Sequence, residues 1–114
     1  MSSKNKMNCE PECRRIPFRL SALNKHVPET IGIYAFWFGN YCVYIGKTEK
    51  QSLHKRLLDH WEGTHNHALH LWIEAKRDSL LVAFLEIDNP SQIGGYERYY
   101  IRIFQPLTNK VRYN

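Results

Sequence analysis

The chain has 114 residues, of which 43% are hydrophobic and 13% aromatic, so it can bury one modest core and leaves no room for a second domain. Lys and Arg outnumber Asp and Glu by 16 to 11, and the resulting net charge of +5 favours a polyanionic partner such as nucleic acid. No run of 18 apolar residues or apolar leader occurs and the three cysteines are an odd number, so we expect a cytoplasmic protein without a membrane segment or a disulfide framework.

The first residues differ in character from the rest of the chain. Residues 1–14 are polar and charged without an apolar period, which predicts a flexible tail before a domain at 15–114. The tail contains Cys9 and Cys13, which we expect to be free thiols. Residues 16–18 then predict a short extended piece, and residues 21–25 predict one turn of helix.

A β-hairpin is the next predicted element. Residues 31–37 and 41–46 are rich in β-branched and aromatic side chains, and Gly39-Asn40 between them is a strong turn signal. A two-residue loop would send Tyr34 and Tyr44 to opposite faces of the hairpin, whereas a three-residue loop places them directly opposite each other on one face.

We favour the three-residue loop because it sorts the side chains by type. One face would then be aliphatic, consisting of Ile33, Ala35, Val43 and Ile45. The other face would carry the two tyrosines and, beside them, Gly32 and Gly46, which would leave a bare patch of backbone.

Helices and one strand complete the predicted fold. Ser52 can cap a helix that runs to about Trp61, and a second helix is expected at about residues 67–76. Residues 79–87 predict a strand buried on both faces, and a last helix ends before Pro106. Its expected buried stripe is Tyr96, Tyr99, Tyr100, Ile103 and Phe104. This order predicts a small α/β sandwich with a three-stranded mixed or antiparallel sheet flanked by helices.

Three polar residues are placed for chemistry. Glu97 falls at the flank of the apolar stripe of the last helix, where a carboxylate is costly unless it is paired or holds a cation. Arg56 and His60 are four residues apart on one helix, so both can face a single ligand. The alternative for each is an ordinary solvated helix residue.

The sequence also contains signals of two other kinds of site. Four histidines, His60, His65, His67 and His70, allow a zinc hypothesis, but their spacing does not follow a Cys/His finger pattern. We interpret His65 and His67 as surface residues able to meet a phosphate backbone. Gly46-Lys47-Thr48 is similar to the end of a P-loop, but Tyr41 occupies the position of its first glycine and excludes that motif.

The tripeptides Gly32-Ile33-Tyr34 and Tyr44-Ile45-Gly46 resemble the two halves of the motif that names the GIY-YIG endonucleases. Four further positions follow in the family's order, namely Arg56, His60, Glu97 and Asn109. The resemblance spans about residues 30–110 and implies the GIY-YIG fold and cleavage of phosphodiester bonds in DNA with Mg²⁺, or with Mn²⁺ in its place.

The resemblance also implies a role for each matching residue. Glu97 would hold the cation, Arg56 would offset charge on the scissile phosphate, and Asn109 would order the site. Tyr34 would act as general base, with its proton affinity shaped by Tyr44, Lys47 and His60. DNA contacts are expected at Gly32, Gly46, Lys47, Arg56, His65 and His67.

The alternative is a nucleic-acid-binding module that retains this fold without cutting and acts with a partner. We expect no separate DNA-targeting domain in this chain, so either hypothesis allows a homodimer or a separate targeting protein as the partner.

Overall fold

The sheet of the protein is antiparallel throughout, with the strand order β1-β4-β2-β3, in a computed structural model that describes residues 15–111. The strands are β1 (Ile16–Pro17), β2 (Gly32–Phe38), β3 (Tyr41–Thr48) and β4 (Leu81–Glu86). The helices are α1 (Leu20–His26), α2 (Leu53–Glu62), α3 (His67–Lys76), the 3₁₀ turn η2 (Arg77–Ser79) and α4 (Pro90–Phe104). The predicted tail and its two cysteines lie outside the described residues.

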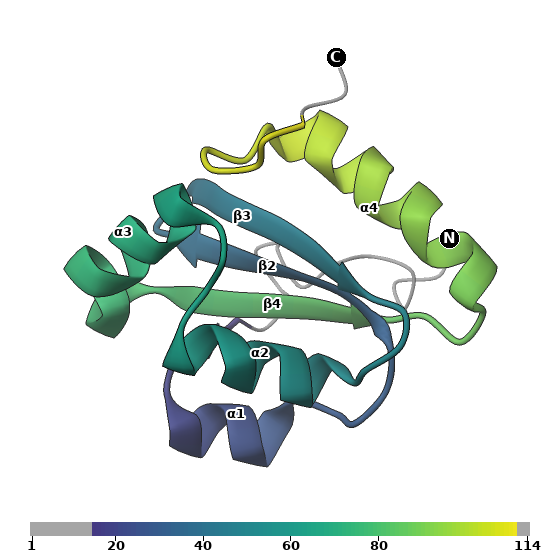
Figure 1. The fold of residues 1–114 in the computed structure, drawn as a ribbon, viewed down its shortest axis with the longest axis horizontal. Coiled ribbons are helices and arrows are strands. Elements are labelled where there is room, and N and C mark those ends of the chain that lie inside the picture. Colours follow the sequence, from purple (N-terminus) through teal and green to yellow (C-terminus); the bar gives the residue numbers. More distant parts are fainter. Residues whose placement is uncertain (1–14, 112–114) are drawn as a thin grey trace.

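Helices cover both faces of the sheet (Figure 1). Buried leucines and isoleucines of α1, α2 and α3 pack with one set of strand residues, and α4 packs with the other set through Ile93, Tyr100 and Ile101. The prediction of a small α/β fold is therefore confirmed. Within residues 15–111, no helix combines the length and apolar character that crossing a membrane requires.

The prediction of three strands is wrong, because a fourth strand joins the sheet. Ile16 pairs with Val82 and Pro17 with Leu81, so the short extended piece becomes an edge strand beside β4. This pairing joins residues about 65 positions apart, which a local pattern does not reveal. Its effect is to place β4 between two strands, with Val82 and Ala83 buried on opposite faces, as predicted.

The hairpin has a two-residue loop, so the predicted three-residue loop is wrong. Phe38 pairs with Tyr41 across Gly39-Asn40, and Gly39 takes a φ of +57°, which glycine adopts without steric cost. The register then shifts by one residue, so that Phe36 pairs with Tyr44 and Tyr34 with Gly46. A β-bulge at this shift adds one residue to β3.

Because of the bulge, Tyr34 and Tyr44 share one face of the hairpin, which a two-residue loop alone would not allow. Tyr34 and Tyr44 lie on one side of the hairpin with their ring centroids 6.2 Å apart. Val43 lies on the side opposite to the predicted one and packs with Tyr34 in the core cluster under α2. Ile33, Ala35 and Ile45 pack against α4, as a group on the other face. The predicted aliphatic face is therefore wrong for Val43.

Two helix starts follow from local caps. The Ser52 hydroxyl accepts a hydrogen bond from the Lys55 N–H at 3.0 Å, and the Asn66 side chain accepts one from the Leu69 N–H at 3.1 Å. Both helices match their predicted ranges closely.

The predicted buried stripe of α4 is partly wrong. Tyr99 and Ile103 are 57% and 51% exposed, while Ile93 and Ile101 are buried instead. The face of α4 that packs against the sheet contains Ile93, Tyr100 and Ile101. Tyr99 and Ile103 are therefore left on the solvent side of the helix. Glu97 lies at the edge of this buried arc and is half-buried.

Candidate active site

Two tyrosines and a histidine meet between the hairpin and α2. The hydroxyl of Tyr34 lies 2.7 Å from Nε2 of His60, and the rings of Tyr34 and Tyr44 lie with centroids 5.5 and 5.9 Å from that of His60. Leu53 and Leu57 anchor α2 in the core, and His60 follows three residues after Leu57 on the same side. His60 is only 6% exposed, so it belongs to the buried stripe of α2.

The two phenols differ in their access to solvent. Tyr34 is 0% exposed, whereas Tyr44 is half-buried and lines a pocket. Burial raises the pKa of Tyr34, with a further increase from Tyr44, against which Arg56 acts. Burial also raises the pKa of Tyr44, while Arg56 lowers it.

Burial and the charge of Arg56 lower the pKa of His60 to about 4. Tyr34 and His60 are therefore both neutral at neutral pH, and they share one proton across their short hydrogen bond. Burial therefore keeps both groups in their neutral forms, and neither accepts a further proton readily at neutral pH.

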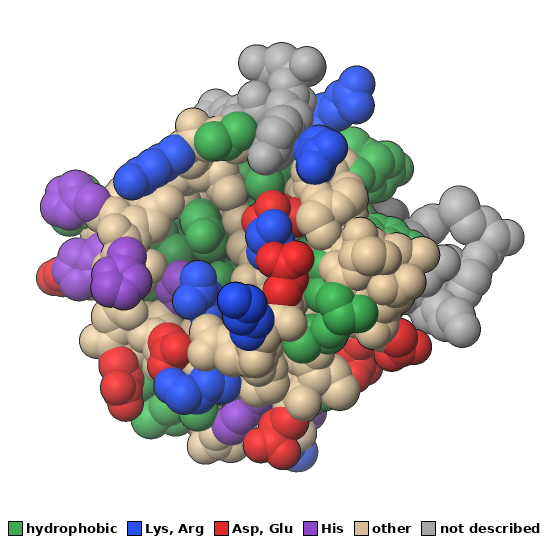
Figure 2. Space-filling model, turned by 45° about the vertical axis from the view of Figure 1, so that its right-hand side comes forward, with side chains coloured by type: hydrophobic (Ala, Val, Ile, Leu, Met, Phe, Trp, Pro, Cys, Tyr) green, Lys and Arg blue, Asp and Glu red, His purple; other side chains and the backbone are tan. Residues whose placement is uncertain are grey.

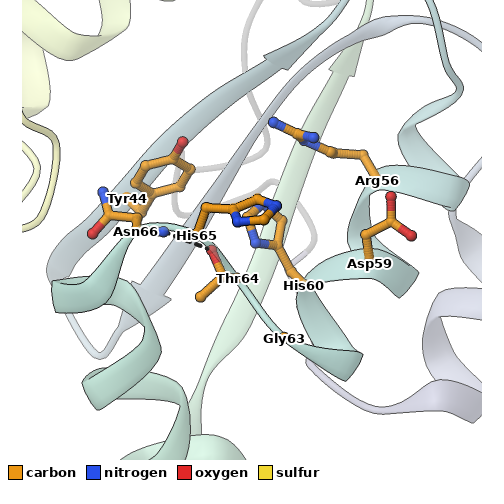
Figure 3. Close-up of a pocket in the computed structure, with 8 residues that line it drawn as sticks. All are labelled: Tyr44, Arg56, Asp59, His60, Gly63, Thr64, His65 and Asn66. Carbon is orange, nitrogen blue, oxygen red and sulfur yellow. Dashed lines mark hydrogen bonds between the residues drawn. The ribbon is translucent and has the colours of Figure 1, made fainter.

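The pocket has a volume of about 180 Å³, which is room for a phosphate group and a few waters (Figure 3). Its lining residues are Tyr44, Arg56, Asp59, His60, Gly63, Thr64, His65 and Asn66. Arg56 also lines a neighbouring hollow with Lys47 and Lys50, so its guanidinium lies between two depressions. Asp59, at the rim, is paired with Lys55 at 2.5 Å.

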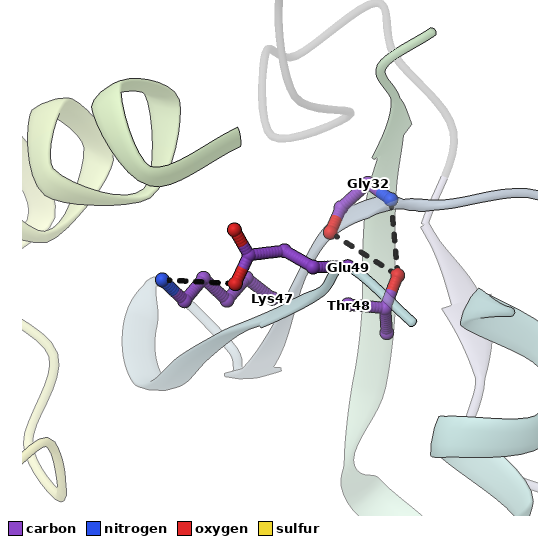
Figure 4. A network of polar contacts seen from close by, with 4 residues as sticks. All are labelled: Gly32, Lys47, Thr48 and Glu49. Atoms are coloured by element: carbon purple, nitrogen blue, oxygen red, sulfur yellow. Dashed lines mark hydrogen bonds and ion pairs between the residues drawn. The ribbon is translucent and has the colours of Figure 1, made fainter. Parts of the chain in front are cut away.

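Glu97 approaches the phenols around the edge strand β3. It comes from α4, on the opposite face of the sheet from α2, yet its charge raises the pKa of both Tyr34 and Tyr44. Burial raises the pKa of Glu97 itself, and Lys47 opposes that rise. Lys47 is in turn paired with Glu49, with 3.3 Å between Nζ and Oε1 (Figure 4). Basic and acidic side chains meet in the middle of this surface (Figure 2).

Glu97 has the properties of a cation ligand. A half-buried carboxylate with a raised pKa gains stability from a nearby positive charge, and its oxygens suit Mg²⁺, which keeps most of its waters when bound. Among residues 15–111, no three His, Cys, Asp or Glu side chains form a metal-binding group. Glu97 would be the protein ligand of such a cation, as the resemblance implies.

The glycines of the two tripeptides do not form the expected bare patch of backbone. Both are buried. A Cβ added to Gly46 would lie 2.3 Å from the Tyr34 hydroxyl, and one added to Gly32 would lie 2.0 Å from the carbonyl oxygen of Leu85. Gly46 thus gives space to the Tyr34 ring, and Gly32 allows β2 to approach β4.

Asn109 fastens the segment after α4 to the bulged strand. Its side chain accepts a hydrogen bond from the Ile45 N–H and donates one to the Ile45 carbonyl, both at 2.8 Å. The Thr108 hydroxyl donates a hydrogen bond of 2.6 Å to the carbonyl of Val43. These contacts cover the free edge of β3 beside Tyr44.

Replacing Asn109 by alanine is expected to lower the free energy of unfolding by about 1–3 kcal/mol, because two hydrogen bonds to Ile45 are lost. Urea denaturation measures this loss, and amide exchange at the Ile45 N–H should become faster. Lys110→Ala, at the exposed neighbouring position, is the control. Unchanged protection of the Ile45 amide would contradict the assigned contact.

The sequence did not predict the roles of three residues near the site. Asn66 donates to the Thr108 carbonyl at 2.9 Å, and it lines the pocket as well as capping α3. Thr48 is buried and accepts a hydrogen bond from the Gly32 N–H at 3.0 Å (Figure 4). An Asn before a helical pattern is a recognisable cap signal, but no local signal marks Thr48 or Thr108.

The two histidines predicted to contact DNA lie in different positions. His65 lines the pocket, whereas His67 is exposed in the first turn of α3 and does not line it. His70 forms an ion pair with Glu74 on the same helix.

The buried state of His60 predicts a loss of stability in acid. The pKa of His60 in the folded protein, about 4, lies below its ordinary value of 6.5. Between these values the unfolded chain binds a proton that the folded chain does not, so the free energy of unfolding should fall by up to about 1.4 kcal/mol per pH unit as the pH drops from about 6.5 to 4. Urea midpoints at several pH values measure this slope.

The slope should become smaller in His60→Gln, and His67→Gln is the control at an exposed histidine. An equal slope in the wild type and in His60→Gln would show that another group carries the effect.

Comparison with family models, with curated proteins and with solved structures finds no match to this chain. The likeness to the GIY-YIG endonucleases therefore rests on the residues quoted above.

Proposed function

We propose that the protein is a divalent-cation-dependent endonuclease that hydrolyses phosphodiester bonds in DNA. The observation that carries this proposal is the meeting of side chains from β2, β3, α2 and α4 around the edge of β3. Tyr44, Arg56 and His60 line one pocket, and the charge of Glu97 acts on the same phenols from the other side of the strand.

Arg56 is suited to binding the scissile phosphate. Its guanidinium reaches both the pocket and the adjoining hollow, and a planar fork of donors matches phosphate oxygens. It offsets the negative charge that builds up on the phosphate during attack. Lys47 and Lys50 line the hollow beside Arg56, together with Glu49, which is paired with Lys47.

Tyr44 is the better candidate to hold the attacking water. Tyr34 was expected to be the general base, but its side chain has no exposed surface and cannot contact a water in the pocket. Tyr44 lines the pocket, and its hydroxyl can accept a hydrogen bond from water. Tyr34 and His60 then lie behind Tyr44, where their rings pack against its phenol and orient it.

Glu97 would hold the cation, which supplies charge stabilisation at the phosphate when bound. Its carboxylate is deprotonated for this role, and Lys47 favours that charged form. One such site per chain suits the cutting of one strand at a time.

The direct test is incubation of supercoiled plasmid, and of branched and flap DNA, with the pure protein and Mg²⁺ or Mn²⁺. Nicked products that disappear in EDTA are expected. Tyr44→Phe should slow nicking strongly, since the hydroxyl that faces the pocket is lost. If no metal and no DNA structure gives cleavage while DNA is bound in a salt-sensitive manner, the proposal is overturned in favour of the non-cutting module.

A further inference from the structure

A second, open hollow of about 480 Å³ adjoins the pocket of the candidate active site. Its lining residues are Asp59, Glu62, Gly63, Thr64, His65 and His70, and four of these also line the pocket. Figure 3 shows the four shared residues, Asp59, Gly63, Thr64 and His65, on the last turn of α2 and on the segment that follows it. We call this space the Glu62 hollow, because Glu62 lines it but does not line the pocket. Its volume lies within the range of about 300–1,000 Å³ that small-molecule sites occupy.

Gly63 keeps the passage between the pocket and the Glu62 hollow free of a side chain. A Cβ at this position would meet no atom within 4 Å, so packing does not require glycine here. Its φ of 166° is extended backbone, so the chain conformation does not require glycine either. A larger residue would therefore be compatible with the fold, and its side chain would occupy the passage.

The charges of the Glu62 hollow indicate which ligand atoms fit. Asp59 and Glu62 contribute carboxylates, and the hydrogen bond from Lys55 lowers the pKa of Asp59, which keeps that group ionised. Two carboxylates repel a phosphate, but they accept hydrogen bonds from amino groups. The acidic and histidine side chains described here do not form a group that could hold a metal ion. Neutral groups with N–H donors are therefore the best match.

His65 adds an aromatic face to this surface. Its side chain is exposed, and it lines both the pocket and the Glu62 hollow. Histidine rings stack on nucleobases that are splayed out of a helix, and stacking of this kind tolerates any base. In a duplex, neighbouring base pairs cover both faces of each base. Stacking on His65 therefore requires an unpaired or flipped-out base.

We propose that the Glu62 hollow binds an unpaired nucleobase of the DNA strand whose scissile phosphate occupies the adjoining pocket. His65 stacks on the base, and Glu62 and Asp59 accept hydrogen bonds from its amino group. Cytosine, adenine and guanine carry an amino group, whereas thymine does not. A base lies one sugar away from its phosphate, which fits two spaces that share four lining residues. The inference rests on the proposed function, and it makes branched, bulged or single-stranded DNA the substrate class.

The test is the affinity of the full-length protein for fluorescent DNA duplexes that contain one unpaired nucleotide, C, A, G or T. Anisotropy is measured in EDTA, so that no cutting intervenes. The three amino-bearing bases should bind at least about fivefold more tightly than thymine, and a fully paired duplex should bind most weakly.

Three variants separate the contributions. Glu62→Gln should reduce the preference over thymine, because the amide replaces an acceptor by a donor, and Gly63→Leu should abolish it by filling the passage. His65→Ala should weaken binding of all four bases alike. Glu29→Gln, at an exposed glutamate between α1 and β2, is the matched control and should keep the wild-type preference. Circular dichroism of each variant checks that it is folded.

Equal affinity for the four bases, or a preference that both Glu62→Gln and Gly63→Leu leave unchanged, would overturn the inference. Binding of a lysine-rich peptide that Glu62→Gln weakens, in a protein without base preference, would instead assign the hollow to a basic protein segment. The proposed function fails separately. A base preference without cleavage under any metal would retain this subsite and overturn the nuclease, whereas Mg²⁺-dependent nicking without base preference would do the reverse.

Discussion

Glu97→Gln is expected to reduce Mg²⁺-dependent nicking by about 10³-fold or more, while the folded protein stays as stable as the wild type. Glutamine keeps the shape of the side chain but removes the charge that would hold the cation. Burial already raises the pKa of Glu97, so the folded protein gains no stability from ionising this carboxyl group, and its neutral replacement should be tolerated. The measurements are initial rates on supercoiled plasmid and thermal unfolding.

The matched control is Glu74→Gln, at an exposed glutamate on α3, which should cut at the wild-type rate. A pH series adds a second readout. Because the pKa of Glu97 is raised, protons compete with the cation more strongly as the pH falls, and the Mg²⁺ concentration needed for half-maximal rate should rise. Nicking that persists in Glu97→Gln would remove Glu97 from the catalytic site.

Gly32→Ala is expected to destabilise the protein by about 3 kcal/mol or more, whereas Gly95→Ala should stabilise it by about 0.5–1 kcal/mol. The difference comes from what the new methyl group meets. At Gly32 it would lie 2.0 Å from the Leu85 carbonyl oxygen, which is backbone of a paired strand and cannot move without breaking the β2–β4 ladder. At Gly95 it meets nothing within 4 Å and favours the helix.

Urea denaturation of both variants under identical conditions measures the two effects, with the slope checked for two-state behaviour. Gly63→Ala is a useful third variant, because its Cβ also meets nothing within 4 Å but the position lies outside any helix. A wild-type urea midpoint for Gly32→Ala would mean that β2 and β4 do not pair in the register described.

Most of the helical structure could be predicted from the sequence. The ranges of α2 and α3 follow from caps and apolar spacing within about ten residues, at Ser52 for one helix and before His67 for the other. The candidate residues could also be identified, because Tyr34, Tyr44 and Glu97 occur in a recognisable order along the chain.

The sheet could not be predicted in the same way. The bulge in β3 depends on how β2 and β3 pair as a whole, and the edge strand β1 depends on its contact with β4. Three errors followed, the number of strands, the loop length and the position of Val43. The tyrosines still share a face, because the extra residue of the bulge compensates for the shorter loop.

The sequence by itself determined which residue types the protein brings to this surface, because local signals place each of them on a strand or a helix. Only the tertiary structure decided which phenol faces the pocket. Tyr34 fills the space above Gly46 and forms a hydrogen bond with His60, and this packing removes it from solvent, while Tyr44 is only half-buried. The physical reason is that burial depends on contacts between β2, β3 and α2, and these segments come together only when the chain folds.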